Sequence, residues 1–97
     1  MYARVVTVFV QPERLDEVIA VVRDSIWPAA KQEKGHGPGL LLVDRQTGKA
    51  ISIALWETEA DMIAGETSPY LREQMGKIVS AFTAAPITEH YEVSLAD

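Results

Sequence analysis

The stretch "GKAISIALWETEA", residues 48–60, decides the fold of this chain. From Ala50 to Trp56 it contains one hydroxyl group, that of Ser52, and no charged side chain. A strand with one face in water alternates apolar with polar residues, and this stretch does not. It therefore predicts a strand over residues 49–57 that is covered on both of its faces.

Three more strands are predicted around this one. Residues 2–10 are rich in β-branched side chains, and residues 87–95 alternate apolar with polar side chains. Residues 40–44 form a further apolar run, which the short turn "RQTG" joins to the opening stretch. The strands over residues 40–44 and 49–57 should therefore pair as a hairpin.

Two helical regions separate the strands. In each, apolar residues recur at spacings of three and four, which places them on one side of a helix. The first region begins at Pro12 and the second at the pair Ser68-Pro69, both of which are helix start signals. The two apolar stripes consist of Leu15, Val18, Ile19, Val22 and Ile26, and of Leu71, Met75, Ile78, Val79 and Phe82.

Local signals predict where these elements end. Pro28 predicts a kink or an end in the first helix, because proline removes a backbone hydrogen bond. The segment "KGHGPG", residues 34–39, predicts a loop in which His36 is solvated. Thr58 is expected to cap a short helix, which is expected to break at Gly65.

The element order predicts an α+β fold, a ferredoxin-like β-α-β-β-α-β antiparallel sheet with both helices on one face. We expect one domain over residues 1–97. The helices can cover only one face of the sheet, yet the strand over residues 49–57 is apolar on both. Monomers rarely expose an apolar patch on the order of several hundred Å². A homodimer packed through the sheet face is therefore expected, with the last strand or its tail reaching the partner.

The amino-acid composition argues against several classes of binding partner. The net charge of −5 and the pI of about 4.9 argue against binding to nucleic acid and to anionic membrane surfaces. The chain has no cysteine, which excludes disulfides and thiolate metal sites. No apolar run approaches the length of about 20 residues that a membrane span needs. Because "MYARVVTVFVQ" has the pattern of a strand rather than of a signal peptide, a cytoplasmic protein is expected.

Three motifs resemble those of a known family. "GPG", residues 37–39, precedes the second strand, "LWETEA", residues 55–60, ends the third, and "TSPYLREQM", residues 67–75, opens the last helix. In element order, length and these motifs the chain resembles the dimeric α/β-barrel superfamily, and within it the antibiotic-biosynthesis-monooxygenase-like (ABM) group. The resemblance implies a dimeric α/β barrel and a cofactor-independent oxidation of an aromatic or apolar substrate.

The chain departs from the family pattern at three positions. Ala54 stands where many members have Glu, Gly65 where many have His, and Tyr70 where a His often follows the Pro. The haem-degrading branch of the family uses an Asn, a Trp and a His, and this chain has no Asn. The departures weigh against haem degradation and remove most of the polar groups that assist oxidation in relatives.

Two residues are candidates for catalysis. His90 lies on the more polar face of the last predicted strand, and imidazole exchanges protons near neutral pH. Tyr70, at the start of the last helix, could direct its phenol into the same pocket. Each has a structural alternative, because His90 could be a hydrogen-bonded surface or interface residue and Tyr70 could pack against the dimer partner.

Four residues are candidates for lining a ligand pocket. The indole of Trp56 could form a pocket wall or anchor the core beneath the short helix. Met62 and Met75 suit an adaptable apolar pocket as well as a plain core. Gly65 could end its helix, or it could leave space where relatives carry His. No combination of His, Asp and Glu on one element has metal-ligand spacing, so no metal site and no cofactor are expected.

Two functions remain open at this point. One is a homodimeric, cofactor-independent monooxygenase with a dry pocket for a small aromatic or apolar substrate. The other is a homodimeric module of the same fold that binds a small ligand, or another protein, without catalysis. The missing Glu, His and Asn favour the second function, and the family resemblance favours the first. The sequence does not name a substrate.

Overall fold

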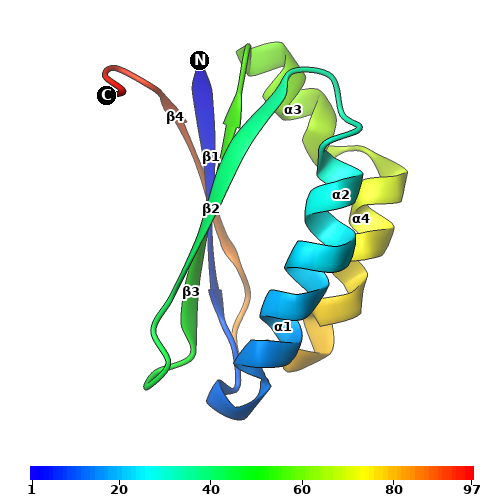
Figure 1. Ribbon diagram of the computed structural model, residues 1–97, viewed down its shortest axis with the longest axis vertical. Coiled ribbons are helices and arrows are strands. Elements are labelled where there is room, and N and C mark those ends of the chain that lie inside the picture. The colour runs from blue at the N-terminus through cyan, green and yellow to red at the C-terminus, as the bar shows by residue number, and fades with distance from the viewer.

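A computed structural model describes residues 1–97 and contains a four-stranded antiparallel sheet with the helices on one face (Figure 1). The strand order is β2-β3-β1-β4. The strands are β1 (Tyr2–Phe9), β2 (His36–Val43), β3 (Lys49–Trp56) and β4 (Ile87–Glu92). The predicted α+β ferredoxin-like fold is thereby confirmed.

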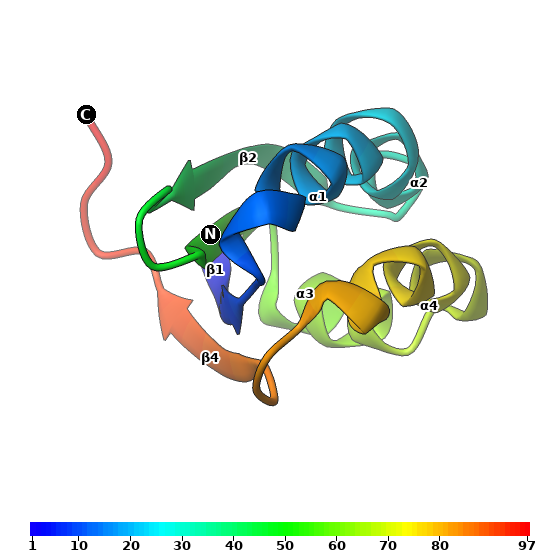
Figure 2. The same ribbon diagram turned by 90° about the horizontal axis from the view of Figure 1, so that it is seen from below.

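The helices form a second layer, seen end-on in Figure 2. The first helical region consists of η1 (Pro12–Arg14), α1 (Leu15–Val21), the π-helical η2 (Val22–Ile26) and α2 (Trp27–Ala30). The second consists of α3 (Glu59–Glu66), α4 (Pro69–Met75) and the 3-10 helix η3 (Gly76–Ala81). None of these helices is both long and apolar enough to cross a bilayer.

The first helical region does not end at Pro28. Its backbone stays helical as far as Ala30, and the π-helical turn η2 comes immediately before α2. Proline lacks the N–H that an α-helix uses and its ring clashes with the carbonyl one turn earlier. The wider spacing of a π turn accommodates such a disruption without stopping the helix.

The prediction of a loop over residues 34–39 is wrong for most of that segment. The turn is confined to its start, where Gly35 has a φ of +78°, and β2 begins at His36. The pairing with β3 shifts register between His36 and Gly39. Because β2 is an edge strand, Pro38 can lie in it without depriving a second neighbour of a hydrogen bond.

Helices α3 and α4 each begin at the predicted cap. Thr58 Oγ1 accepts a hydrogen bond from the Asp61 N–H at 3.0 Å, and Ser68 Oγ accepts one from the Leu71 N–H at 3.3 Å. The predicted break at Gly65 is wrong, because α3 continues through this residue and ends at Glu66. The last strand is also shorter than predicted and ends at Glu92.

The compact core lies at one end of the sandwich. It consists of Val10, Leu15, Val18, Val22, Ile78 and Ala81. These residues join the end of β1 to α1 and η3, with partly buried side chains of β1 and β2 packed around them. Trp56 and Met62 are buried at the opposite end, where β3 meets α3. A second, smaller cluster of Ala29, Ala30 and Leu71 joins α2 to α4.

The face of the sheet that points away from the helices is apolar and open. In the pairing register Val5 lies opposite Ile53, and Ile53 lies opposite Leu40. At its margins Leu40 is 59% exposed and Tyr91 is 51% exposed. The helices thus cover one face of β3, and nothing within the chain covers the other (Figure 2).

Candidate functional site

A cavity of about 710 Å³ lies between the sheet and the helical layer. The central strand β3 presents small side chains to it, since Ala50, Ser52 and Ala54 all line the cavity. Gly39 on the neighbouring strand β2 also lines the cavity and adds no side chain to this surface of the sheet. The small residues of the opening stretch therefore leave room on the face of the sheet that a larger side chain would fill.

The sheet register arranges the cavity floor in rows. Arg4 lies opposite His90 on one side and opposite Ala54 on the other, and Ala54 lies opposite Gly39. All four line the cavity. Because residues directly opposite in an antiparallel pair share a face, one row holds two polar side chains next to two positions with almost no side chain.

The helical layer supplies an apolar roof. The side chains that close the cavity from above belong to η2, α4 and η3 and include Val22, Ile26, Leu71, Met75, Ile78 and Val79. They belong mainly to the two stripes identified in the sequence. The cavity therefore has a long apolar body and a polar end near Arg4 and His90, which is the usual make-up of a small-molecule site.

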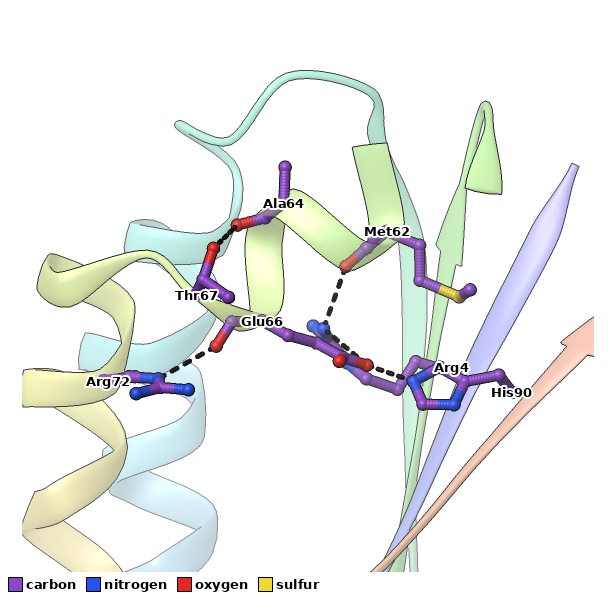
Figure 3. A network of polar contacts seen from close by, with 7 residues as sticks. All are labelled: Arg4, Met62, Ala64, Glu66, Thr67, Arg72 and His90. Carbon is purple, nitrogen blue, oxygen red and sulfur yellow. Dashed lines mark hydrogen bonds and ion pairs between the residues drawn. The ribbon is translucent and has the colours of Figure 1, made fainter. Parts of the chain in front are cut away.

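The polar end is built around the carboxylate of Glu66, the last residue of α3 (Figure 3). Its Oε1 atom is hydrogen-bonded to His90 Nε2 and lies 3.5 Å from Arg4 Nη1. Arg4 Nη1 also donates to the Met62 carbonyl at 3.3 Å. The carbonyl of Glu66 accepts from Arg72 Nε at 3.0 Å, which ties the end of α3 to α4. Strands β1 and β4 are thus joined to α3 at one carboxylate.

Arg4 is a cation enclosed by apolar surroundings. Its side chain is 12% exposed, and its guanidinium carbon lies 5.2 Å from the centroid of the Trp56 ring. Burial lowers the pKa of Arg4, and the charge and hydrogen bond of Glu66 act in the opposite direction. Glu66 therefore offsets part of what it costs to hold this charge inside the fold.

His36 also lines the cavity, and the expectation that it is solvated is wrong. Its ring meets the ring of Trp56 edge to face, with centroids 4.8 Å apart, and its Nδ1 atom is buried without a hydrogen-bond partner. Burial lowers the pKa of His36, and the charges of Arg4 and Lys31 lower it further. The cause of the error is the strand that replaces the expected loop, because that strand fixes His36 against Trp56.

The predicted site residues fall into three places. Gly65, Met75 and His90 line the cavity. Trp56 and Met62 are buried immediately behind it, where Trp56 contacts Gly65 and Arg4 and the Met62 carbonyl holds Arg4.

Tyr70 lies elsewhere. It is 57% exposed and lines a separate, mostly polar hollow between η2–α2 and α4. The structure therefore does not bring Tyr70 and His90 to one pocket, because Tyr70 starts α4 on the side of the helical layer that faces away from the cavity.

Gly65 does not leave space for a ligand. A Cβ atom at this position would lie 2.4 Å from Cη2 of Trp56, so the indole already occupies the volume where a side chain would begin. Trp56 and Gly65 are therefore complementary, and the ring forms a solid wall behind the cavity.

Arg4 and Glu66 were not singled out by the sequence motifs. A usable signal existed for Arg4, since it alternates in register with Val6 and Val8 and so faces the helices. A cation on the inward face of a strand requires a partner. No comparable signal marked Glu66, because its position depends on α3 continuing past Gly65.

The arrangement can support proton transfer. With Nε2 of His90 donating to the Glu66 carboxylate, Nδ1 becomes the basic nitrogen, as assigned from this contact. A carboxylate that orients a histidine in this way fixes the tautomer of the imidazole and stabilises its protonated form. No group of three or more His, Asp or Glu side chains is placed to hold a metal ion.

Comparison with solved structures shows the same architecture. An antibiotic biosynthesis monooxygenase superposes with a TM-score of 0.78 over 98% of this chain and 100% of its own, at 18% identity. SnoaB, a cofactor-independent oxygenase from Streptomyces nogalater, gives a TM-score of 0.77 over 98% of this chain and 94% of its own, at 14% identity. Rv0793 from Mycobacterium tuberculosis gives 0.75 over 99% and 96%, at 14% identity.

This chain has the ABM fold. No family model matches its sequence. Among curated proteins, the uncharacterized proteins Rv2557 and Rv2558 of Mycobacterium tuberculosis are 37% and 34% identical to it over 97% and 98% of its length. The chain spans only 41% and 39% of the length of these two relatives. The likeness thus establishes the ABM fold and leaves the reaction to be argued from the site.

Proposed function

We propose that this chain is a homodimeric ABM-fold protein that binds a small, largely apolar aromatic compound in its cavity and oxidises it with molecular oxygen, without a cofactor. The observation that carries the proposal is the Glu66–His90 pair at the polar end of an apolar cavity of about 710 Å³. The fold shared with a cofactor-independent oxygenase supports the same choice of reaction.

Each residue of the polar end has a role in this reaction. His90 Nδ1 removes a proton from a substrate CH₂ group that lies between aromatic rings and is conjugated with a carbonyl, as in an anthrone. Glu66 orients the imidazole and stabilises its protonated form, and Arg4 holds Glu66 in place. The apolar roof excludes water from the resulting carbanion.

The electrons for oxygen come from the substrate itself. The deprotonated carbon transfers electrons to O₂ and forms a C–O bond, and the proton held by His90 completes a hydroperoxide. Loss of water from this hydroperoxide converts a CH₂ group into a carbonyl. One O₂ is consumed and one H₂O released for each substrate, so no external reductant is needed.

Oxygen consumption with anthrone tests the reaction. His90→Ala should lower the rate by about 10²- to 10⁴-fold, the contribution typical of a positioned base. Glu66→Gln should lower it less, because Gln can still accept the hydrogen bond that orients the imidazole but carries no negative charge. Glu73→Gln is the matched control, since Glu73 is exposed on α4. An unchanged rate in His90→Ala would contradict the assignment of His90 as base.

Binding without catalysis is the second candidate function. Two observations favour it: Ala54 contributes no polar group to the floor, and the volume above Gly65 is filled by Trp56. Under this function, aromatic compounds raise the melting temperature of the protein but no oxygen is consumed with anthrones or quinols. Turnover that depends on His90 would exclude it.

The homodimer is proposed on the open sheet face. Its apolar side chains belong to all four strands and include Val5, Leu40, Leu42, Ile51, Ile53 and Ile87. Packing of two such faces about a two-fold axis would bury these side chains in both subunits. The cavity would remain on the opposite side of each sheet.

A further inference from the structure

The cavity has the opposite charge character to the rest of the protein. The chain has a net charge of −5. The side chains that line the cavity, however, include three fixed cations, Arg4, Lys31 and Arg72, against the single carboxylate of Glu66. A cleft lined by one sign of charge within low-dielectric walls concentrates ligands of the other sign. The cavity therefore favours an anion that the protein surface would repel.

Arg4 has unused hydrogen-bonding capacity at this place. Its Nη1 atom is committed to the Met62 carbonyl and to Glu66, whereas Nε and Nη2 donate to no protein acceptor. Nε–H and Nη2–H form one straight edge of the guanidinium, and this edge matches the two oxygens of a carboxylate. Burial lowers the pKa of Arg4 even with Glu66 beside it, so the cation is only partly compensated.

The floor next to Arg4 offers room for an anionic group. Ala54 lies opposite Arg4 in the sheet and Gly39 lies opposite Ala54, so two near-empty positions follow the guanidinium. His36, which lies opposite Trp56, and Lys31 also line the cavity. A carboxylate above Ala54 would thus lie beside the guanidinium of Arg4, in a cavity that Lys31 also lines.

We propose that the ligand of this cavity is an aromatic carboxylate, whose carboxylate pairs with the Nε–Nη2 edge of Arg4 above Ala54. Its ring system fills the apolar body of the cavity beneath α4 and η3. A phenolate, which has one oxygen, would use only half of this edge. The inference rests on the proposed function in that it requires the cavity to bind a small aromatic molecule, but it does not require catalysis.

Matched pairs of probes test the charge requirement. Benzoate, 2-naphthoate and anthracene-2-carboxylate would each be compared with the neutral carboxamide of the same shape by isothermal titration calorimetry on the intact chain. The carboxylate of the best-fitting pair should bind at least about tenfold more tightly than its amide, as a charge-assisted bidentate contact provides. Equal dissociation constants within every pair would overturn the inference.

Two substitutions should change this preference in opposite directions. Arg4→Met removes the guanidinium but keeps an extended chain, and it should bring the dissociation constant of the carboxylate to that of the amide. Glu66→Gln removes the competing carboxylate and should tighten carboxylate binding while leaving amide binding unchanged. If Arg4 and Glu66 served only to stabilise the fold, both substitutions would weaken the binding of both the carboxylate and the amide. That result would contradict the inference.

Two further variants complete the set. Arg4→Lys keeps the charge without the straight edge, so it should retain a smaller preference for the carboxylate over the amide. This variant also tests the inference if Arg4→Met fails to fold. Arg45→Met is the matched control, because Arg45 is exposed, lies outside the cavity lining and forms an ion pair with Asp16. If amides bind as tightly as carboxylates, the cavity remains a binding site and only the anion assignment fails. If no probe of either kind binds, both the inference and the proposed function fail.

Discussion

At the scale of single residues, the contact between Gly65 and Trp56 fixes the wall behind the cavity. Gly65→Ala would place a Cβ atom 2.4 Å from Cη2 of a fully buried indole. We expect it to destabilise the protein by about 1–3 kcal/mol through overpacking, although Ala favours a helix over Gly by about 1 kcal/mol. Urea unfolding measures the difference.

Gly76→Ala provides the control for that measurement. Gly76 has helical φ and ψ angles, and a Cβ atom there would meet nothing within 4 Å. This substitution should leave the free energy of unfolding unchanged or raise it by up to about 1 kcal/mol. Equal stability of the two variants would show that Trp56 does not occupy the space above Gly65.

A second residue-scale prediction concerns acid stability. Because burial and the charges of Arg4 and Lys31 lower the pKa of folded His36 below 6.5, the unfolded chain takes up this proton first. The neutral imidazole of His36 therefore stabilises the folded state at neutral pH. This stabilisation is lost as the pH falls from about 6.5 through the lower pKa of folded His36.

The measurement is the melting temperature on acidification from about pH 7.5 to about pH 5.5. The native protein should lose more of its melting temperature over this interval than His36→Gln. All other ionisable groups are the same in both proteins, so their effects cancel in the comparison. Equal losses would mean that His36 is as accessible to protons in the folded state as in the unfolded chain.

Residue-scale errors in the sequence interpretation have a common cause. The alternation of β1 was sufficient to place Arg4 inside, but its partner Glu66 depended on the length of α3. His36 was assigned to a loop because glycine and proline surround it, and tertiary pairing with β3 outweighed that local preference. Local composition does not contain these long-range contacts.

At the scale of elements, α3 positions the central carboxylate, and its first turn depends on the Thr58 cap. Thr58→Ala removes the acceptor of the Asp61 N–H and should lower the free energy of unfolding by about 1 kcal/mol. Thr67→Ala is the control at the other end of the same helix, where Oγ1 only donates to the Ala64 carbonyl. It should cost less than about 0.5 kcal/mol. A reversed order would contradict the role of the cap.

The elements themselves were well predicted where local signals agree with packing. The hydroxyl caps at Thr58 and Ser68 and the apolar strands β1 and β3 appear in the structure as expected. Of the kink or end expected at Pro28, the structure excludes only the end, because a π turn accommodates the proline and no sequence pattern specifies that turn. Element types were therefore predictable, and several boundaries were not.

At the scale of the whole molecule, the open sheet face predicts a dimer. Light scattering should give about twice the 10.7 kDa mass of the chain. Ile53→Arg places a charge in the middle of this face and should produce a monomer. Ile63→Arg makes the same change at an exposed position on α3 and should leave the dimer intact. A native protein that stays monomeric at micromolar concentration would rule out this interface.

The overall fold was predictable because its requirements repeat along the chain. Two apolar helical stripes and four strand segments in a β-α-β-β-α-β order allow few arrangements, and the apolar strand β3 limits them further. The cavity was not predictable in the same way. Its volume results from Ala50, Ser52, Ala54 and Gly39 being small at adjacent places in the sheet, which becomes visible only once the register is known.

The most direct test of the cavity as the functional site is to map a bound aromatic molecule by NMR. The labelled protein would be titrated with 2-naphthol, and the backbone amide shifts would be followed. We expect the largest changes at Arg4, Ala54, Gly65 and His90, around the cavity. Changes confined to Tyr70, Gln74 and Lys77, which line the other hollow, would contradict the assignment of the site.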